Sequence, residues 1–251
     1  MKAEFEKTYH EVEAGHWWFR TRRELVHQLV RRAAPNRQAA ILEIGCSGGP
    51  LLQLLKADGY TNLTGIDISE KAVSLCRERN LGKVMVMDAQ VPNFPPASFD
   101  VITASDVLEH LREDRQAIAA WHKLLRPGGT VMIFVPAFKS LWSGHDVVNQ
   151  HFHRYRAAEL VKLLREAGYE IERRGYWNFF LFLPVALLRT VKRGLAGKNP
   201  ELPSGDLQPC AEPLNSILTG LLRLENWLLL AGLNFPWGVS AAVIARRPKS
   251  A

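Results

Sequence analysis

Short apolar runs alternate with amphipathic segments along most of the chain. Runs such as 39–44 (AAILEI) and 129–135 (GTVMIFV) have the continuous apolar character of buried strands, and the segments between them carry apolar residues at helical spacing. Strands that alternate with helices pair in parallel through right-handed crossovers. We therefore predict an α/β fold, a doubly wound and mostly parallel sheet of seven strands. The expected strands are 39–44, 62–67, 83–87, 99–104, 129–135, about 169–177 and a terminal strand, and the expected helices are 16–34, 50–56, 69–79, 113–125 and 156–167.

Two segments depart from this alternation. An amphipathic helix at 16–34, ended by Pro35, precedes the first strand. Before the last strand, residues 178–235 contain two strongly apolar stretches. No repeat or low-complexity tract divides the chain, so we expect one domain over residues 1–251. Its expected parts are an N-terminal helical lid at 1–38, a core at 39–177, an apolar helical insertion at 178–235 and the last strand at 236–251.

The apolar insertion does not have the pattern of membrane-spanning helices. Its first stretch, 178–191, is short and contains Pro184, and its second, 214–233, carries Arg223 and Glu225 near its middle. We expect two helices that cover the active site or lie on a membrane surface. Packing against the domain's own core, or against a second copy in a homodimer, explains the same pattern. Basic residues that suit lipid phosphates flank the first stretch, namely Arg189, Lys192, Arg193 and Lys198.

Composition bears on the compartment and the partners. The content of 47% hydrophobic and 23% charged residues is ordinary for a globular protein. Cys46, Cys76 and Cys210 lack the spacing of a zinc site or a redox pair, and residues 1–7 lack a signal peptide's apolar run, so we expect a cytoplasmic protein. The chain has a net charge of +7, and its excess of basic residues lies outside residues 41–150. This distribution suits an acidic partner such as nucleic acid, a phosphorylated substrate or the inner membrane face. A solvated basic surface explains this charge as well.

A glycine-rich turn follows the first strand. In residues 43–49 (EIGCSGG), small side chains stand between a strand and a helix. Glycines let the backbone approach a ligand closely, and the start of the next helix offers unpaired amides and positive potential. The turn therefore predicts a ligand site, although a tight structural connection accounts for the glycines too.

Two carboxylates follow the next strands. Asp67 ends the second strand, 22 residues past Gly45, where a carboxylate accepts hydrogen bonds from ribose hydroxyls. Asp88, with Ala89, follows the third strand and is placed to bind the exocyclic amine of adenine, unless it is an exposed loop aspartate. The carboxyl ends of parallel strands share one edge of the sheet, so these residues predict a nucleoside site.

The order of these motifs resembles that of the class I S-adenosylmethionine (SAM)-dependent methyltransferases. The resemblance covers roughly residues 39–136, over ILEIGCSGG, GIDIS, the MDAQ loop, SFDVITASDVLEHL and LLRPGGTVMIFVP. It implies a Rossmann-like methyltransferase fold, SAM as the cofactor and methyl transfer to an acceptor. The chain is most similar to the branch that methylates small molecules and lipids at oxygen or carbon, including enzymes of quinone biosynthesis.

The resemblance also implies which residues hold the cofactor. Glu43 and Gly45 would border its methionine moiety, although Glu43 could instead cap backbone amides. The family usually has glycine where this chain has Ser47, so we expect the loop to follow a locally different path. At the methionine end of the cofactor we expect Glu43, Gly45, Ser105, Asp106 and His110. We expect Asp67 at the ribose and Asp88 and Ala89 at the adenine. The other cofactor-binding residues expected are Cys46, Ser47, Gly49 and Ile68.

The acceptor side is predicted after the fifth strand. SAM carries its own leaving group, so neither a metal nor a nucleophilic side chain is required, but a hydroxyl acceptor is helped by a general base such as histidine. We favour His151 over His145 and His153 for this role. The residues expected to contact the acceptor are Trp142, Asp146, Arg154 and Tyr155. In the alternative, Asp146 and Arg154 pair to pin the loop, and His151 or His153 caps the following helix.

Paired tryptophans stand near the start of the chain. The segment 16–20 (HWWFR) is similar to one in bacterial methyltransferases of this type, where a leading helix folds over the cofactor. Trp17 and Trp18 would then form part of a lid. Buried anchors that pack the helix on the sheet are the other interpretation.

Three other functions stay open from the sequence. A nicotinamide-dependent oxidoreductase would usually show G-x-G-x-x-G, which residues 45–50 do not fit. A non-catalytic SAM-binding or assembly protein would not need the polar groups at 142–155. An RNA methyltransferase suits the charge, but no RNA-binding module is visible and residues 105–108 (SDVL) replace the amino-methylating tetrapeptide. A small-molecule or lipid-linked acceptor therefore fits better than nucleic acid.

Overall fold

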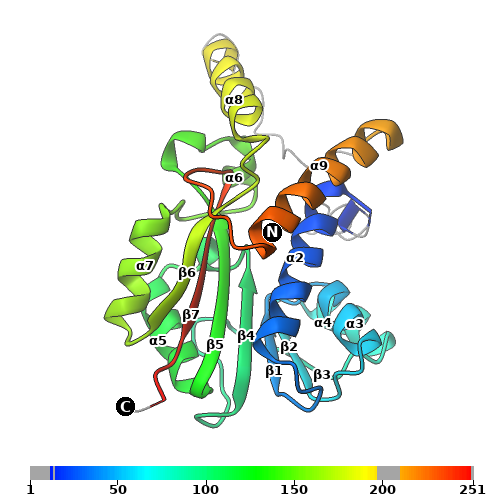
Figure 1. Ribbon diagram of the computed structural model, residues 1–251, viewed down its shortest axis with the longest axis vertical. Coiled ribbons are helices and arrows are strands. Elements are labelled where there is room, and N and C mark those ends of the chain that lie inside the picture. Colours follow the sequence, from blue (N-terminus) through cyan, green and yellow to red (C-terminus); the bar gives the residue numbers. More distant parts are fainter. Residues whose placement is uncertain (1–11, 14, 197–209, 250–251) are drawn as a thin grey trace.

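The chain folds into one seven-stranded sheet with helices on both faces (Figure 1). A computed structural model describes residues 12–13, 15–196 and 210–249. The strands are β1 (Ile41–Ile44), β2 (Leu63–Asp67), β3 (Lys83–Val86), β4 (Phe99–Ser105), β5 (Leu125–Pro136), β6 (Glu170–Trp177) and β7 (Ser240–Arg246). The helices are α2 (Trp17–Ala33), α3 (Pro50–Ala57), α4 (Glu70–Glu78), α5 (Asp114–Leu124), α6 (Gly144–Val148), α7 (Ala157–Glu166), α8 (Phe182–Ala196) and α9 (Glu212–Leu230), with short 3-10 helices η1 (Leu108–His110) and η2 (Lys139–Leu141).

The strand order is β3-β2-β1-β4-β5-β7-β6. Strands β1 to β5 pair in parallel, whereas β7 runs antiparallel between β5 and β6. The chain moves outward from β1 in one direction to β3 and then returns to β4 on the other side of β1. In open α/β sheets, ligands bind in the crevice at such a reversal, outside the carboxyl ends of the strands.

The two faces of the sheet carry separate apolar cores. Along β5, Val131, Ile133 and Val135 pack in the core that includes α5 and α7, whereas Met132 and Phe134 face the core that includes α2, α3 and α9. This alternation along a continuous apolar run is what a strand buried on both faces requires. The predicted fold class is confirmed, including each predicted strand and helix.

The segment after β5 contains more helix than we expected. Residues 142–155, for which we predicted no helix, include α6. The N-terminus of α6 is closed by a capping box, in which the side chains of Ser143 and Asp146 each accept a hydrogen bond from the other residue's backbone amide. A helix this short has too few residues for a hydrophobic period, so apolar spacing could not reveal it.

The helices α8 and α9 lie between β6 and β7 in the sequence. Helix α9 packs along α2, where the Asn226 amide donates a hydrogen bond of 2.8 Å to the Thr21 carbonyl. Helix α8 extends beyond the end of the sheet (Figure 1). None of the helices in the described ranges combines the length and hydropathy that a bilayer crossing needs. The side chains of Lys192 and Arg193 and all of Lys198, predicted to flank this insertion, lie outside the described part of the chain.

Candidate active site

The loop between β1 and α3 has the conformation that a close ligand approach requires. Gly45 has φ +71°, and a Cβ atom there would lie 2.4 Å from Cγ2 of Val107. Ser47 also has a positive φ, 48°, in the region that favours glycine. Its hydroxyl donates a hydrogen bond of 2.8 Å to the Glu13 carboxylate. The loop therefore leaves backbone, rather than side chain, facing the crevice at Gly45.

Asp67, at the end of β2, ties this loop to the next one. Its Oδ2 atom accepts a 2.9 Å hydrogen bond from the Ser47 amide, and its Oδ1 atom accepts one of 2.9 Å from the Ser69 amide. Each carboxylate oxygen has a second lone pair. Asp67 thus shapes both loops at the carboxyl edge of the sheet.

An apolar surface continues from Asp67. The side chain of Ile68 is 74% exposed, which is unusual for isoleucine, and Met87 and Ala89 lie in the same wall. Asp88 accepts a 2.8 Å hydrogen bond from the Gln90 amide, which fixes its carboxylate beside that wall. The arrangement suits a flat heterocycle with an amine at its edge.

The end of β4 supplies polar groups close to Gly45. The hydroxyl of Ser105 is buried and has no hydrogen-bond partner in the structure. Asp106 adopts φ 56°, and its Oδ2 atom lies 3.4 Å from Nη1 of Arg22. Burial raises the pKa of Asp106 from its ordinary value, against the opposing charge of Arg22. An unpaired buried hydroxyl at a cavity wall indicates a place for a ligand.

These segments line one cavity of about 1120 Å³. That volume exceeds the usual range for a site holding a single small molecule, about 300–1,000 Å³, so there is room for a cofactor and an acceptor. The predicted site residues in its wall are Gly45, Ser47, Asp67, Ile68, Asp88, Ala89, Ser105, Asp106, His110, His145, His151 and Arg154.

Comparison with known proteins decides the family. Residues 17–173 match a family described as "Methyltransferase domain". The chain belongs to this methyltransferase family. The match covers the glycine-rich loop, the two carboxylate-bearing strand ends and the segment after β5, so the resemblance to class I SAM-dependent methyltransferases is confirmed. Family membership also removes the nicotinamide-dependent alternative.

Two curated relatives have similar sequences. The methyltransferase is 33% identical over 172 residues to a probable S-adenosylmethionine-dependent methyltransferase of Mycolicibacterium smegmatis, covering 66% of this chain and 65% of the relative. It is 30% identical over 151 residues to a ubiquinone biosynthesis O-methyltransferase of Pseudomonas aeruginosa, covering 53% of this chain and 65% of the relative. The alignments thus span 65%, just under two thirds, of each relative's length.

A solved structure shows the same fold. The crystal structure of a putative sarcosine dimethylglycine methyltransferase from Galdieria sulphuraria matches with a TM-score of 0.60 and 17% identity, over 92% of this chain and 86% of that one. SAM is the cofactor of this methyltransferase family, and the cavity fits it: the glycine cradle, the Asp67 carboxylate and the orphaned Ser105 hydroxyl face one space.

The far end of the cavity is formed by α6 and the segment that follows it. His151 Nδ1 lies 2.8 Å from Oδ1 of Asp146, and both side chains are almost completely buried. His145 also lines the cavity, with its ring centroid 5.9 Å from that of His151. Because Asp146 engages Nδ1, the other ring nitrogen of His151 is left for a group in the cavity.

Asp146 and Arg154 form a buried ion pair. The Arg154 guanidinium donates bonds of 2.7 and 3.0 Å to the two Asp146 oxygens and one of 3.0 Å to the Ala137 carbonyl. Burial alone would raise the pKa of Asp146, but the bonds from His151 and Arg154 hold it well below its ordinary value. The pairing foreseen as the alternative role of Asp146 and Arg154 is present. Neither His151 nor His153 caps α7, whose N-cap residue is Arg156.

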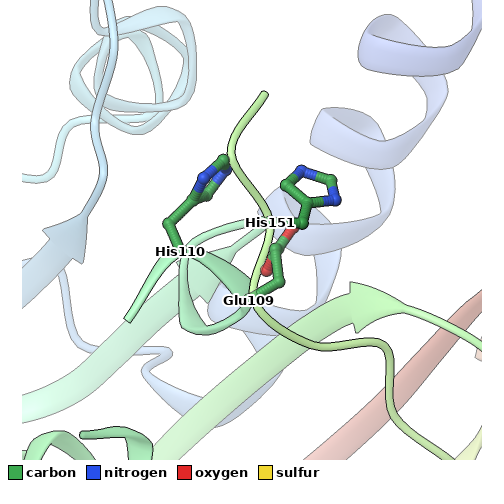
Figure 2. A group of neighbouring side chains, drawn as sticks. All are labelled: Glu109, His110 and His151. Atoms are coloured by element: carbon green, nitrogen blue, oxygen red, sulfur yellow. The ribbon is translucent and has the colours of Figure 1, made fainter. Parts of the chain in front are cut away.

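Glu109 and His110 approach His151 from η1 (Figure 2). The rings of His110 and His151 have centroids 4.6 Å apart. Burial and the neighbouring His151 lower the pKa of His110 to about 4, so its imidazole is neutral near pH 7. Glu109 is fully buried, and its pKa is raised well above the ordinary value by burial and by Asp106.

Several residues predicted from the sequence lie outside the cavity wall. His153 is exposed and packs against Tyr155, and Tyr155 is itself in the core, donating a 3.0 Å hydrogen bond to Asp114. Trp142 and Asp146 are also absent from the residues that line the cavity. The same holds for Glu43, Cys46 and Gly49.

The sequence analysis missed functional candidates on both sides of the site. Glu109 stands directly before His110. A charged residue between apolar Leu108 and a predicted site histidine could have marked it as a candidate from the sequence. Arg22 lies on the buried face of α2, with its guanidinium 4.2 Å from the ring of Trp177 and 4.9 Å from that of Trp18. In the sequence, Arg22 could have been noticed as a charged residue on the apolar face of a predicted amphipathic helix.

Trp17 and Trp18 have features of both interpretations, a lid and a buried anchor. Both line the cavity, as a lid would. Trp18 also packs edge-on against Trp177 at 5.7 Å, and the Trp17 amide donates a 2.8 Å hydrogen bond to Asn215 on α9. The start of α2 is therefore anchored where it covers the site.

Proposed function

We propose that this methyltransferase moves the methyl group of SAM to a hydroxyl oxygen of a small-molecule or lipid-linked acceptor. The observation that supports oxygen most directly is the His151–Asp146 pair, which lies in the same cavity as the cofactor loop. An imidazole oriented by a carboxylate is suited to take a proton from a hydroxyl. The relative from Pseudomonas aeruginosa is named an O-methyltransferase, which agrees with this choice.

The main task of the protein in this reaction is to align the acceptor oxygen with the methyl carbon of SAM. The acceptor oxygen attacks the methyl carbon, the carbon–sulfur bond breaks as the carbon–oxygen bond forms, and S-adenosylhomocysteine leaves. His151 takes the hydroxyl proton, and Asp146 steadies the imidazolium that forms. Trp17 and Trp18 of α2 line the cavity, where their apolar rings help to exclude water from the transfer.

The acceptor side of the cavity is partly apolar. Val185 and Leu188 of α8 belong to its wall, and Arg189 stands beside them, donating a 2.6 Å hydrogen bond to the Leu141 carbonyl. This combination suits an acceptor that carries an apolar tail. It supports a lipid-linked or otherwise apolar substrate over nucleic acid.

Transfer of a labelled methyl group tests this proposal. The full chain is incubated with methyl-labelled SAM and a panel of phenols and long-chain quinols, and label is counted in the organic phase. His151→Ala is expected to lower turnover by about 100-fold or more while SAM affinity is unchanged, and His153→Ala, outside the cavity, serves as the matched control. If His151→Ala and His153→Ala turn over equally, the assigned role of His151 is wrong.

We also propose that α8 and α9 bring the protein to the cytoplasmic face of a membrane. Each helix presents large apolar side chains to solvent, and residues 151–251 carry 14 basic against 8 acidic side chains, which suits an anionic surface. The exposed residues are Leu183, Leu187, Leu188 and Val191 on α8 and Leu214, Ile217, Leu224 and Trp227 on α9.

Sedimentation with vesicles tests the membrane contact. Vesicles of mixed phosphatidylglycerol and phosphatidylcholine are expected to carry the wild type down, and the Leu183→Ser/Leu187→Ser variant is expected to stay in the supernatant. Light scattering in the absence of lipid measures whether the protein forms a dimer, which is the alternative explanation of the exposed apolar residues. A dimer that the same double substitution dissociates, with no vesicle binding, would assign this surface to a second copy of the chain instead.

A further inference from the structure

Three side chains with metal-binding atoms meet in the wall of the cavity (Figure 2). Glu109 and His110 come from η1, directly after β4, and His151 comes from the segment after α6. One ligand atom from each residue lies within 4.8 Å of those of the other two. All three residues line the cavity that the cofactor loop also borders.

The Glu109 carboxyl group is buried without a hydrogen bond from any of the described residues. It is 0% exposed, and neither of its oxygens has a hydrogen-bond partner in the structure. Leaving such a group unsatisfied costs about 1–3 kcal/mol, and more for a charged one. Unsatisfied buried groups in native proteins call for a specific explanation, and an ion is one of the few available.

The two imidazoles are prepared as ligands. Asp146 lies 2.8 Å from Nδ1 of His151, and Arg154 holds Asp146 in turn. A carboxylate on one ring nitrogen of a histidine is the arrangement that orients the other nitrogen toward a metal. The ring of His110 lies close by, with its centroid 4.6 Å from that of the His151 ring.

We propose that Glu109, His110 and His151 bind one divalent transition-metal ion, with zinc the best match to the donor set. Two imidazoles and one carboxylate form a known three-ligand zinc site that leaves a further position open. Ligand atoms around zinc at about 2.0–2.2 Å lie within about 3.5 Å of one another, so binding draws these side chains together. The open position faces the cavity.

The role of this ion rests on the proposed function, because it acts on the same acceptor hydroxyl. An acceptor oxygen at the open position would have its pKa lowered by the cation. The oxygen then attacks the methyl carbon of SAM, the carbon–sulfur bond breaks, and the hydroxyl proton passes to solvent. In the metal-bound protein, His151 serves as a ligand and the ion takes over activation of the hydroxyl.

Cobalt(II) binding tests the site without SAM or acceptor. The full chain is freed of metal by dialysis against a chelator and titrated with Co²⁺, whose visible absorption reports the ligand geometry. One equivalent is expected to bind with a tetrahedral spectrum, and Zn²⁺ is expected to displace it. Glu109→Gln and His151→Ala are expected to weaken binding at least tenfold, whereas His153→Ala, with an exposed imidazole, is expected to bind as the wild type does.

The outcomes separate this inference from the proposed function. No stoichiometric Co²⁺ binding, or equal binding by the wild type, Glu109→Gln and His151→Ala, overturns the metal site. Circular dichroism of Glu109→Gln guards against a folding defect, because the amide has nearly the shape of the carboxyl group. Methyl transfer that persists in chelator and is lost in His151→Ala would uphold the proposed function while rejecting a role for the ion.

Discussion

Single residues with unusual backbone angles define the cofactor end of the site. Gly45, Ser47 and Asp106 all have positive φ, and all three line the cavity. Such conformations cost free energy for residues other than glycine and persist where the surrounding structure fixes them. For Ser47 the surroundings are visible, since Asp67 accepts from its amide and Glu13 accepts from its hydroxyl. The departure from the family's glycine is thus accommodated locally.

Gly45→Ala is expected to disable the cofactor loop. The added methyl group would meet Val107 at 2.4 Å and would force alanine into a left-handed conformation. We expect a loss of more than about 1 kcal/mol in the free energy of unfolding and at least a tenfold loss of SAM affinity, measured by urea denaturation and calorimetry. Gly220→Ala is the matched control, since no atom of the described residues lies within 4 Å of the added group. Unchanged SAM binding by Gly45→Ala would show that the loop does not contact the cofactor.

The histidines show what sequence reasoning could settle at the residue scale. It identified the segment 142–155, and it favoured His151, which the structure places in the cavity. Sequence reasoning could not show that His151 points into the cavity and His153 does not. The direction in which each side chain of this segment points depends on contacts with residues elsewhere in the chain. His151 meets Asp146 and His110, whereas His153 meets only solvent and Tyr155 among the contacts described. Tyr155 looked functional but belongs to the core.

At the scale of elements, a buried carboxylate connects α9 to the chain entering α8. Glu225 is 0% exposed and accepts hydrogen bonds from the amides of Asn178, Phe179 and Phe180, at 2.6 to 3.2 Å. In the sequence, this charge argued only against a membrane-spanning helix. Its positive role required knowing that two segments about 46 residues apart are in contact.

Glu225→Ala is expected to destabilise this junction strongly. It leaves the amides of buried Asn178 and of partly buried Phe179 and Phe180 without their acceptor, at about 1–3 kcal/mol for each buried group, so we expect the free energy of unfolding to fall by about 3 kcal/mol. Urea denaturation measures the loss, and hydrogen exchange at residues 178–180 locates it. Glu212→Ala, at the exposed start of α9, is the control. Equal effects of the two substitutions would contradict the buried role of Glu225.

The ends of helices and strands were predictable where proline or glycine marks them in the sequence. Pro50 begins α3 and Gly59 follows its end, as expected from a residue with fixed φ and one that tolerates positive φ. The short helices η1 and α6 were not predicted. They depend on tertiary contacts such as the hydrogen bond from the Phe152 amide to the Glu109 carbonyl, at 2.7 Å, rather than on local periodicity.

At the scale of the whole molecule, the strand order gathers the site. Gly45 follows β1, Asp67 ends β2 and Ser105 ends β4, and these three strands are neighbours in the sheet. Parallel pairing was predictable from the alternation of strands and helices. The antiparallel placement of β7 was not, because a buried strand shows the same apolar run in either direction. The convergence of Arg22 and Glu109 on the site also depends on this long-range packing.

The central claim is that the cavity at this sheet edge binds SAM through Asp67. Calorimetric titration of the wild type, Asp67→Ala and Asp100→Asn with SAM tests it most directly. Asp100 is a matched control because it stands at the start of β4, where it accepts hydrogen bonds from Ala40 and Arg126 at the opposite edge of the sheet. We predict one-site binding that Asp67→Ala weakens at least tenfold and that Asp100→Asn leaves unchanged. Absence of SAM binding by the wild type, or equal binding by the wild type and Asp67→Ala, would contradict the account.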